Sequence, residues 1–91
     1  TTSFVRDPRV KAWVLDNAGG KCEACDKPAP FMTESGRPFL EVHHVLRLAD
    51  GGSDTVKNAV AICPNCHRAF HHAEDADNRS RSNVKNLGRL E

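Results

Sequence analysis

The sequence predicts a small α+β domain built around a four-cysteine zinc knuckle, with helices on either side of two short strands. Its 91 residues, 38% of them hydrophobic, are enough for one domain with a small core. Two Cys-x-x-Cys pairs lie in the chain, and strand-like and helix-like segments lie around and between them. A core of this size usually needs a disulfide or a metal for stability, and the cysteines can provide either.

The chain divides into three parts by composition. Residues 1–20 hold a predicted N-terminal helix, residues 21–74 the metal-stabilised core, and residues 75–91 a polar and basic tail. Because the sequence starts with threonine, we expect it to be one module of a longer protein. Its longest apolar stretch, residues 59–63, is too short to span a bilayer, and no signal peptide is recognisable. We therefore expect a cytoplasmic protein with reduced cysteines and no membrane partner.

The first helix has clear start and stop signals. An Asp-Pro pair at residues 7–8 predicts its N-terminus, and a Gly-Gly pair at residues 19–20 predicts its end. Val10, Trp13 and Val14 fall on one face at helical spacing. We expect Trp13 to be an anchor of the core on that face.

The next strand carries the first histidines. Residues 39–45 alternate in a way that places Glu41 and His43 on one side of a strand, and Val42 and His44 on the other.

The remaining elements follow from composition. Residues 50–54 predict a loop, and the apolar residues 58–63 predict a second strand. A Pro-Asn pair then leads into a short helix over residues 66–74. Residues 75–83 predict a polar connector, followed by a weak helix.

Charge alone does not identify a nucleic-acid-binding protein. Thirteen basic and twelve acidic side chains leave a formal net charge of +1. The tail is more basic, with Arg79, Arg81, Lys85 and Arg89 against Glu91. These residues fit phosphate contacts or a solvated helix face equally well.

The cysteine spacing favours a structural zinc site. Each Cys-x-x-Cys pair forms a tight turn, a knuckle, that brings two sulfurs together. Two knuckles can complete a tetrahedral thiolate cage for zinc that leaves no position for water. The cage would consist of Cys22, Cys25, Cys63 and Cys66. Two disulfides are an alternative, although a bridge across two residues closes little loop. The run Cys-Pro-Asn-Cys-His at residues 63–67 also fits covalent haem attachment, but no export signal or well-placed axial methionine accompanies it.

All five histidines lie within residues 43–72, where they suggest a second, catalytic metal site. His67 and His71 share one helix face, and His43 from the strand can be a third ligand. Three protein ligands leave positions open for water and a phosphate oxygen. His44, on the opposite side of the strand, can act as a general base, and Asn58 can orient it through its side chain or backbone.

Two readings of the histidines compete with catalysis. They could join the zinc cage, or they could pack in an ordinary core. Five imidazoles at these spacings beside a zinc knuckle favour a functional site. His72 points away from the face of His67 and His71, so we expect it at the surface or near a phosphate.

These residues resemble a known family. His43-His44, Asn58 and His67 resemble the motif of the HNH nucleases, which share a ββα-metal (His-Me finger) core, and His71 makes the site similar to that of nuclease colicins. With its cysteines, the segment LEVHHVLRLADGG and the segment NAVAICPNCHRAFHH look most like the C-terminal nuclease domain of McrA-type, modification-dependent restriction endonucleases. The resemblance covers residues 21–72.

The resemblance implies roles for individual residues. His43 and His67 would be ligands of a catalytic divalent cation, His71 a third ligand, His44 the general base and Asn58 the residue that orients it. The cation would be Mg²⁺, Mn²⁺, Co²⁺ or Ni²⁺, and an imidazole-rich site suits the transition ions better. The products would carry 5′-phosphate and 3′-hydroxyl ends.

The resemblance also implies partners. The substrate would be DNA, possibly modified, with the recognition domain elsewhere in the parent protein. Double-strand cleavage would need a homodimer or two sequential nicks. The core helix would lie against the minor groove, with Arg68 and Lys57 near phosphates. The alternatives are a zinc-ribbon module that binds nucleic acid or protein without catalysis, and a ribonuclease.

Overall fold

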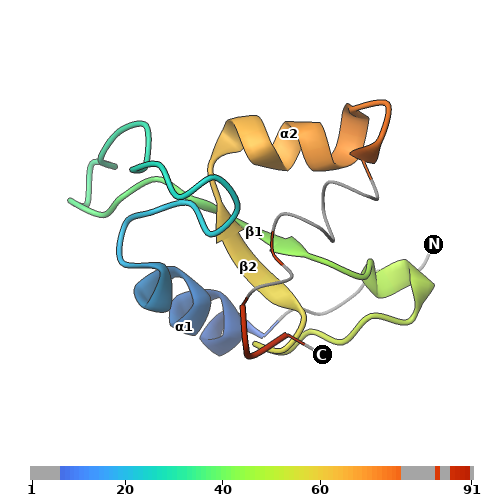
Figure 1. Ribbon diagram of the computed structural model, residues 1–91. Coiled ribbons are helices and arrows are strands. Elements are labelled where there is room, and N and C mark those ends of the chain that lie inside the picture. The colour runs from blue at the N-terminus through green and yellow to red at the C-terminus, as the bar shows by residue number, and fades with distance from the viewer. Residues whose placement is uncertain (1–6, 77–83, 85–86, 91) are drawn as a thin grey trace.

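The computed structural model describes residues 7–76, 84 and 87–90, and in this part of the chain a two-stranded sheet lies between two helices (Figure 1). Helix α1 contacts both strands, whereas α2 contacts β1. The α+β class predicted from the sequence is therefore confirmed. The elements, in chain order, are α1 (Pro8–Ala18), β1 (Glu41–His44), the 3-10 turn η1 (Leu48–Asp50), β2 (Ala59–Ile62) and α2 (Pro64–His72).

Helix α1 begins and ends at the predicted residues. The Asp7 side chain accepts a hydrogen bond from the Arg9 amide at 2.9 Å, and Pro8 occupies the first helical position. Gly19 adopts a left-handed conformation with φ of 62° and closes the helix. Glycine reaches this conformation without steric cost, so the sequence signal and the backbone geometry agree.

The prediction that Trp13 anchors the core is wrong. Val14 is fully buried, but Trp13 keeps 46% of its surface exposed. The helix buries a narrow stripe centred on Val14, and the indole lies at the margin of that stripe beside the C-terminal segment. There the Arg89 guanidinium lies 5.3 Å from the ring centroid, a cation–π distance.

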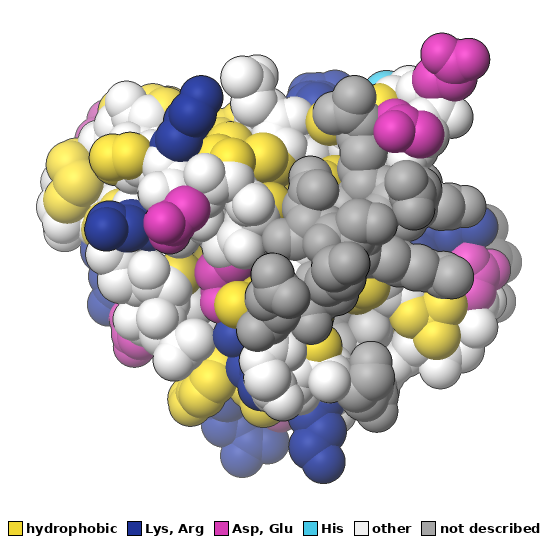
Figure 2. Space-filling model, in the orientation of Figure 1, with side chains coloured by type: hydrophobic (Ala, Val, Ile, Leu, Met, Phe, Trp, Pro, Cys, Tyr) yellow, Lys and Arg dark blue, Asp and Glu magenta, His cyan; other side chains and the backbone are white. Residues whose placement is uncertain are grey.

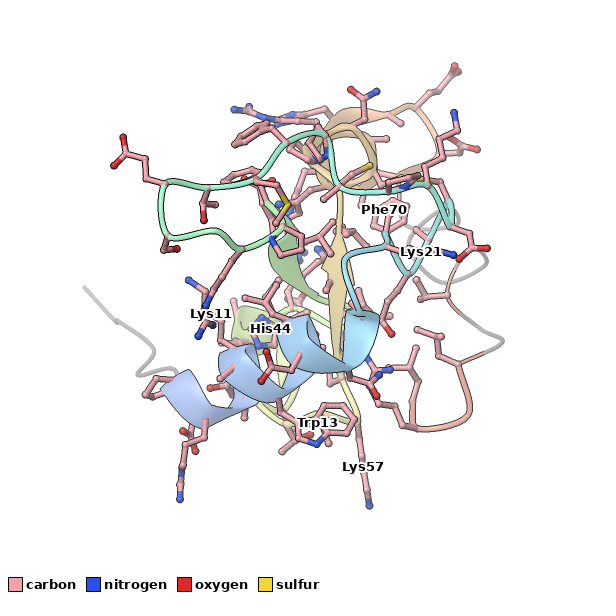
Figure 3. All side chains as sticks on the ribbon, turned by 90° about the vertical axis from the view of Figure 1, so that its left-hand side faces the viewer. Lys11, Trp13, Lys21, His44, Lys57 and Phe70 are labelled. Carbon is pink, nitrogen blue, oxygen red and sulfur yellow. The ribbon has the colours of Figure 1, made fainter. Side chains whose placement is uncertain are left out.

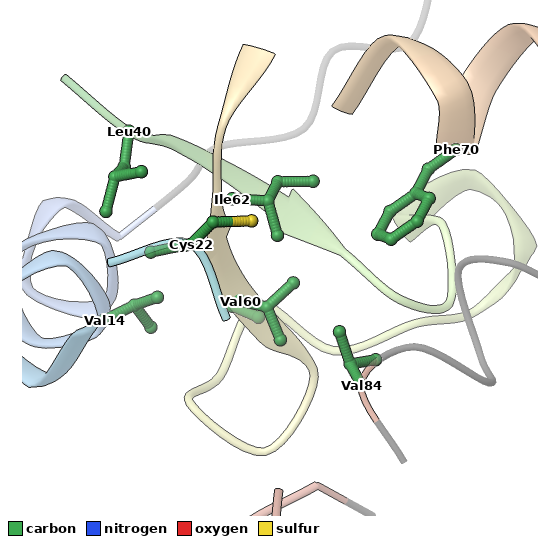
Figure 4. Close-up of a cluster of buried hydrophobic side chains, with 9 residues drawn as sticks. Val14, Cys22, Leu40, Val60, Ile62, Phe70 and Val84 are labelled. Carbon is green, nitrogen blue, oxygen red and sulfur yellow. The ribbon is translucent and has the colours of Figure 1, made fainter. Parts of the chain in front are cut away.

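Strands β1 and β2 pair antiparallel, with Glu41 opposite Ile62 and His44 opposite Ala59. Both are shorter than the predicted segments. All four residues of β2 are fully buried, because the strand is covered on both faces. The core around β2 contains side chains from both helices, the first knuckle and the tail (Figure 4), including Val14, Cys22, Leu40, Val60, Ile62, Phe70 and Val84.

Helix α2 begins two residues earlier than predicted, at Pro64, and ends at His72. Cys63 is its N-cap residue and Pro64 its first residue, a position where proline loses no hydrogen bond. Phe70 anchors the helix in the core. Its start is thus set by the second knuckle.

The described part of the tail has a structural role. Arg89 forms two hydrogen bonds with the Glu23 carboxylate, at 2.7 and 2.8 Å, and also donates to the carbonyls of Val56 and Ala59. Glu23 follows Cys22, so this ion pair ties the tail to the turn that carries the first cysteine pair. The Arg89 guanidinium therefore stabilises the fold and is not available for a phosphate contact.

The expected weak helix after the connector is not seen in the described tail residues, which form turns. Leu87 donates to the Val84 carbonyl at 3.1 Å, and Leu90 to the Leu87 carbonyl at 3.2 Å. Arg79, Arg81 and Lys85 lie outside the described residues. No helix in the described ranges is both long and apolar enough to cross a bilayer.

Candidate metal centre and active site

The four cysteines meet at one point, and we call them the cysteine cluster: Cys22, Cys25, Cys63 and Cys66. Their sulfurs all lie within 4.8 Å of one another. The Sγ atoms of Cys25 and Cys63 are 3.9 Å apart, close to the roughly 3.8 Å between sulfurs in a tetrahedral zinc site. The amides of Ala24 and Cys25 approach Cys22 Sγ at 3.4 Å, as in a thiolate-binding knuckle.

The electrostatics of the cysteine cluster fit a bound cation. Burial acts to raise the pKa of the Cys22 thiol, but amide donors from Cys25, Cys63 and Ala24 outweigh it and lower the pKa to about 7. Burial and the neighbouring sulfurs raise the pKa of Cys66. Several thiolates this close repel one another unless a cation lies between them. The cluster is therefore positioned to bind a metal.

Three of the histidines form a second group, the histidine cluster: His43, His67 and His71. His43 comes from β1 and the other two from consecutive turns of α2. The ring centroids are 5.4 Å apart for His43 and His67, 5.2 Å for His43 and His71, and 4.9 Å for His67 and His71. One nitrogen from each ring lies within 4.8 Å of the others, so one ion can be reached by all three.

The environment keeps two of these rings neutral. Burial, followed by the charges of His67, His71 and His44, lowers the pKa of His43 to about 4. Burial and nearby positive groups, which include Arg47 and Arg68, also lower the pKa of His71. A neutral imidazole keeps the lone pair that a metal ligand needs.

A carboxylate holds the third ring of the histidine cluster. Glu41 Oε1 lies 2.9 Å from His67 Nδ1. An acceptor on one ring nitrogen fixes the tautomer and leaves the other nitrogen for the metal, an arrangement common around protein metal sites. Glu41 and His43 share one face of β1, so this strand supplies both a ring and the support for another.

A cavity of about 360 Å³ joins the histidine cluster to His44. Its lining residues include Val42, His43 and His44, three consecutive residues of β1. Successive side chains of a strand point to opposite faces, so we infer that the cavity runs along the strand edge that does not pair with β2. At this edge the side chains of His43 and His44 can both reach the cavity, although they leave the strand on opposite faces. The other lining residues are Arg47, Leu48, Ala49, His67 and His71.

The partner of the His44 ring is Asp54. His44 Nε2 and Asp54 Oδ1 are 2.8 Å apart, and the two side chains are only 11% and 17% exposed. Figure 3 shows His44 beside α1. The side chain of Asn58, by contrast, is hydrogen bonded within the described residues to Leu46 and Ser53 and not to the His44 ring.

Asn58 nevertheless lies close to His44 through the backbone. Its carbonyl accepts a 2.9 Å hydrogen bond from the amide of Val45, the residue that follows His44. Asn58 is only 3% exposed. It therefore fixes both the end of β1 and the loop that follows.

The expected phosphate contacts lie in different places. Arg68 is exposed on α2, next to His67. Lys57 extends into solvent at the end of the molecule opposite α2 (Figure 3). His72 is exposed, as expected. On the face shown in Figure 2, Lys and Arg side chains are dispersed among acidic and neutral ones, in keeping with the small net charge.

Sequence reasoning missed three residues at this site. Glu41 could have been found, because it lies two residues before His43 on the same strand face. Arg47 lines the cavity, and the only sequence feature that pointed to it was its position three residues after His44. Asp54 lies in a segment whose composition indicates only a loop, so no sequence pattern pointed to its contact with His44.

The comparisons with known proteins agree with this geometry. The sequence profile of the HNH endonuclease family matches residues 22–73, which include both clusters. The chain is 50% identical over 88 residues to the type IV methyl-directed restriction enzyme EcoKMcrA of Escherichia coli strain K12, a match that covers 97% of this chain and 32% of that enzyme. It is also 38% identical over 60 residues to pyocin-S2 of Pseudomonas aeruginosa, covering 60% of this chain and 9% of the pyocin.

Solved structures show the same similarity. The type IV phosphorothioation-dependent restriction endonuclease ScoMcrA superposes with a TM-score of 0.79 at 34% identity, over 90% of this chain and 16% of that one. The modification-dependent TagI restriction endonuclease superposes with a TM-score of 0.64 at 26% identity, over 77% and 24%. This chain thus spans about a third or less of each relative's length. The matched profile, with both clusters inside it, shows that the chain belongs to the HNH endonuclease family.

Proposed function

We propose that this chain is the nuclease domain of a modification-dependent restriction endonuclease and that it hydrolyses DNA to 5′-phosphate and 3′-hydroxyl ends. The observation that carries the proposal is the cavity shared by the histidine cluster and His44. A binding module with a structural metal has no use for a separate imidazole beside an open ligand set. The names of two relatives, which describe methyl-directed and phosphorothioation-dependent restriction, support the substrate class.

The two clusters would hold different ions. The cysteine cluster would hold structural Zn²⁺, because four thiolates complete its coordination. The histidine cluster would hold a catalytic divalent cation, with Mn²⁺, Co²⁺ or Ni²⁺ better suited to imidazole ligands than Mg²⁺. When bound, that cation supplies charge stabilisation to the phosphate and to the leaving 3′ oxygen. Glu41 keeps the His67 ring oriented for this task.

His44 would act as the general base. It takes one proton from a water molecule in the cavity, and the water oxygen forms a bond to phosphorus as the bond to the 3′ oxygen breaks. The 3′ oxygen gains a proton from solvent, and His44 returns its own proton to solvent, so the residue is regenerated. A positioned base of this kind contributes a factor of about 10² to 10⁴ in rate.

Basic residues near the cavity would contact the DNA backbone. Arg68, which is exposed beside His67, and Arg47, which lines the cavity, would contact phosphates near the scissile bond. Lys57, at the end of the molecule opposite α2, remains a predicted phosphate contact. Arg79 and Arg81, which lie outside the described residues, also remain predicted contacts. Backbone contacts bind without reading sequence. Selection of modified DNA would therefore belong to another domain of a longer, cytoplasmic protein.

One histidine centre cuts one strand. A double-strand break would therefore require two copies of the domain acting together, as a homodimer, or two sequential nicks. Nicked circular plasmid accumulating before linear plasmid would indicate sequential action by single domains.

Plasmid nicking tests the proposal. Zinc-loaded protein with Mn²⁺ is expected to convert supercoiled plasmid to nicked circles, and His44→Ala is expected to be slower by at least about 100-fold. Equal nicking by the two proteins would remove the enzymatic claim and favour a zinc-ribbon binding module. Faster cleavage of RNA than of DNA by the same preparation would assign a ribonuclease instead.

A further inference from the structure

We propose that Asp54 is a positioning residue for His44, holding its Nε2–H so that Nδ1 is the atom that accepts the proton from water. The inference rests on the proposed function, because it assigns a tautomer to the general base named there. The sequence leaves two routes open for Asn58 to orient this ring, through its side chain or its backbone, and the side chain makes no hydrogen bond to the ring within the described residues.

The contact between the two residues is direct and sheltered. Asp54 Oδ1 lies 2.8 Å from His44 Nε2, and neither side chain is more than 17% exposed. An ionised carboxylate can only accept hydrogen bonds, so the ring nitrogen facing it must carry the proton. A neutral imidazole has one protonated nitrogen, which leaves the lone pair on Nδ1.

Asp54 is kept ionised by its surroundings. Its Oδ2 accepts the backbone N–H of Asp7, at the N-terminus of α1. Burial acts to raise the pKa of Asp54, but the Asp7 amide and the His44 ring outweigh it, so the pKa lies below its ordinary value. Both carboxylate oxygens thus have a donor, and the side chain is fixed between α1 and β1.

The loop before Asp54 is built to place it. The side-chain NH₂ group of Asn58 donates to the backbone carbonyls of Leu46 and Ser53, and its side-chain oxygen accepts the backbone N–H of Leu46. All three distances lie between 2.8 and 2.9 Å. Gly52 packs so closely on this turn that a Cβ there would lie 2.0 Å from the Leu46 oxygen. Asn58 therefore acts on His44 indirectly, by holding the loop that presents Asp54.

The geometry makes an unusual prediction for Asp54→Asn. The Asp7 N–H needs an acceptor, so the amide oxygen of the new side chain must occupy the Oδ2 position. Its NH₂ group then faces His44 Nε2 and can only donate. The variant would keep the shape of the site but place the ring proton on Nδ1, the wrong nitrogen. An exchange of this kind beside a catalytic histidine can cost up to about 10⁴ in rate.

The first test is the tautomer of the unmodified chain. Nitrogen NMR of zinc-loaded protein, at about pH 8 where an ordinary imidazole is neutral, should show the His44 proton on Nε2. His44→Ala identifies the resonance by its loss. A proton on Nδ1 in the unmodified chain would overturn the proposal, and this measurement does not depend on any variant folding.

The second test is the nicking rate of Asp54→Asn. It should fall by about 100- to 10 000-fold, with unchanged zinc content and Mn²⁺ affinity, and its His44 proton should move to Nδ1. Asp16→Asn, which makes the same chemical change at an exposed site on α1, should cut at the unmodified rate. In a His44→Ala background Asp54→Asn should add no further loss, because Asp54 acts through that ring.

The outcomes separate the two proposals. If Asp54→Asn cuts at the unmodified rate while His44→Ala is slowed as expected, the positioning role is wrong and the proposed function stands. If His44→Ala cuts as well as the unmodified chain, both are wrong. A further loss in the double variant would make Asp54 a structural residue and would also reject the positioning role.

Discussion

The cysteine cluster and the histidine cluster share helix α2 but differ in how they are closed. The sulfurs come from two tight turns and lie within 4.8 Å of one another, so four of them could complete a tetrahedral site without solvent. The imidazoles come from a strand edge and one helix face, and they open onto a cavity of about 360 Å³. A site closed to solvent suits an ion that stabilises the fold. A site open to a cavity suits an ion that must accept a substrate oxygen.

The two clusters also depend on each other. Cys63 is the N-cap residue of α2 and Cys66 lies in its first turn, so an ion bound by the cysteine cluster would fix where the helix begins. His67 follows Cys66 directly, and its position is therefore set by the cysteine cluster. This comparison predicts an order of effects, in which loss of the first ion removes the second site but the reverse does not hold.

The largest expected effect is the loss of the whole fold in Cys22→Ser. Structural zinc sites contribute on the order of 10 to 16 kcal/mol, against a typical total stability of about 5 to 15 kcal/mol. Circular dichroism and zinc content of the purified chain check this. A Cys22→Ser protein that stays folded with one zinc would show that the cysteine cluster does not support the core.

The next effect is loss of cleavage without loss of fold on brief chelation. Three imidazoles hold an ion less tightly than four thiolates, so EDTA should strip the histidine cluster first. Nicking should stop, the circular dichroism spectrum should stay unchanged, and added Mn²⁺ should restore cleavage. Loss of secondary structure in step with loss of cleavage would contradict two separate sites.

Asn58→Ala should reduce cleavage by about 100-fold while zinc remains bound, because a displacement of the base by an ångström costs about that much. The variant leaves three backbone groups of the Leu46 and Ser53 turn without their partner, at about 1 to 3 kcal/mol each. Nicking rate, thermal melting and zinc content check it. Ser35→Ala, a change on an exposed loop remote from this turn, is the control. Unchanged nicking by Asn58→Ala would separate this turn from catalysis.

The smallest of these effects is expected for Glu41→Gln. Its carboxylate holds the His67 ring from outside the ligand set, and the loss of such a support typically weakens metal affinity by about 10- to 100-fold. Mn²⁺ titration measures it, with zinc content as the internal control. Unchanged Mn²⁺ affinity would mean that the helix alone orients His67.

The sequence allowed the parts of the site that depend on local spacing to be predicted. Caps at Asp7 and Gly19 marked α1, and strand alternation placed His43 and His44 on opposite faces. One helical turn separates His67 from His71. Each of these signals involves residues only a few positions apart, so it does not depend on how distant parts of the chain pack.

The sequence could not predict contacts that depend on how loops fold back. Asp54 meets His44 across a loop that the Asn58 side chain and the close packing of Gly52 hold in place. Trp13 had helical spacing suited to the core, but it is half-exposed beside Arg89, which reaches α1 from the tail. Contacts of this kind join residues far apart in the chain and leave no periodic pattern.

Counting metal ions tests the central claim most directly. Zinc-loaded protein should bind one Mn²⁺ per chain, and His67→Ala should bind none while keeping its zinc and its fold. His72→Ala removes an exposed imidazole from the same helix and should bind Mn²⁺ as the unmodified chain does. Undiminished Mn²⁺ binding by His67→Ala would contradict the account, because the catalytic ion would then lie elsewhere.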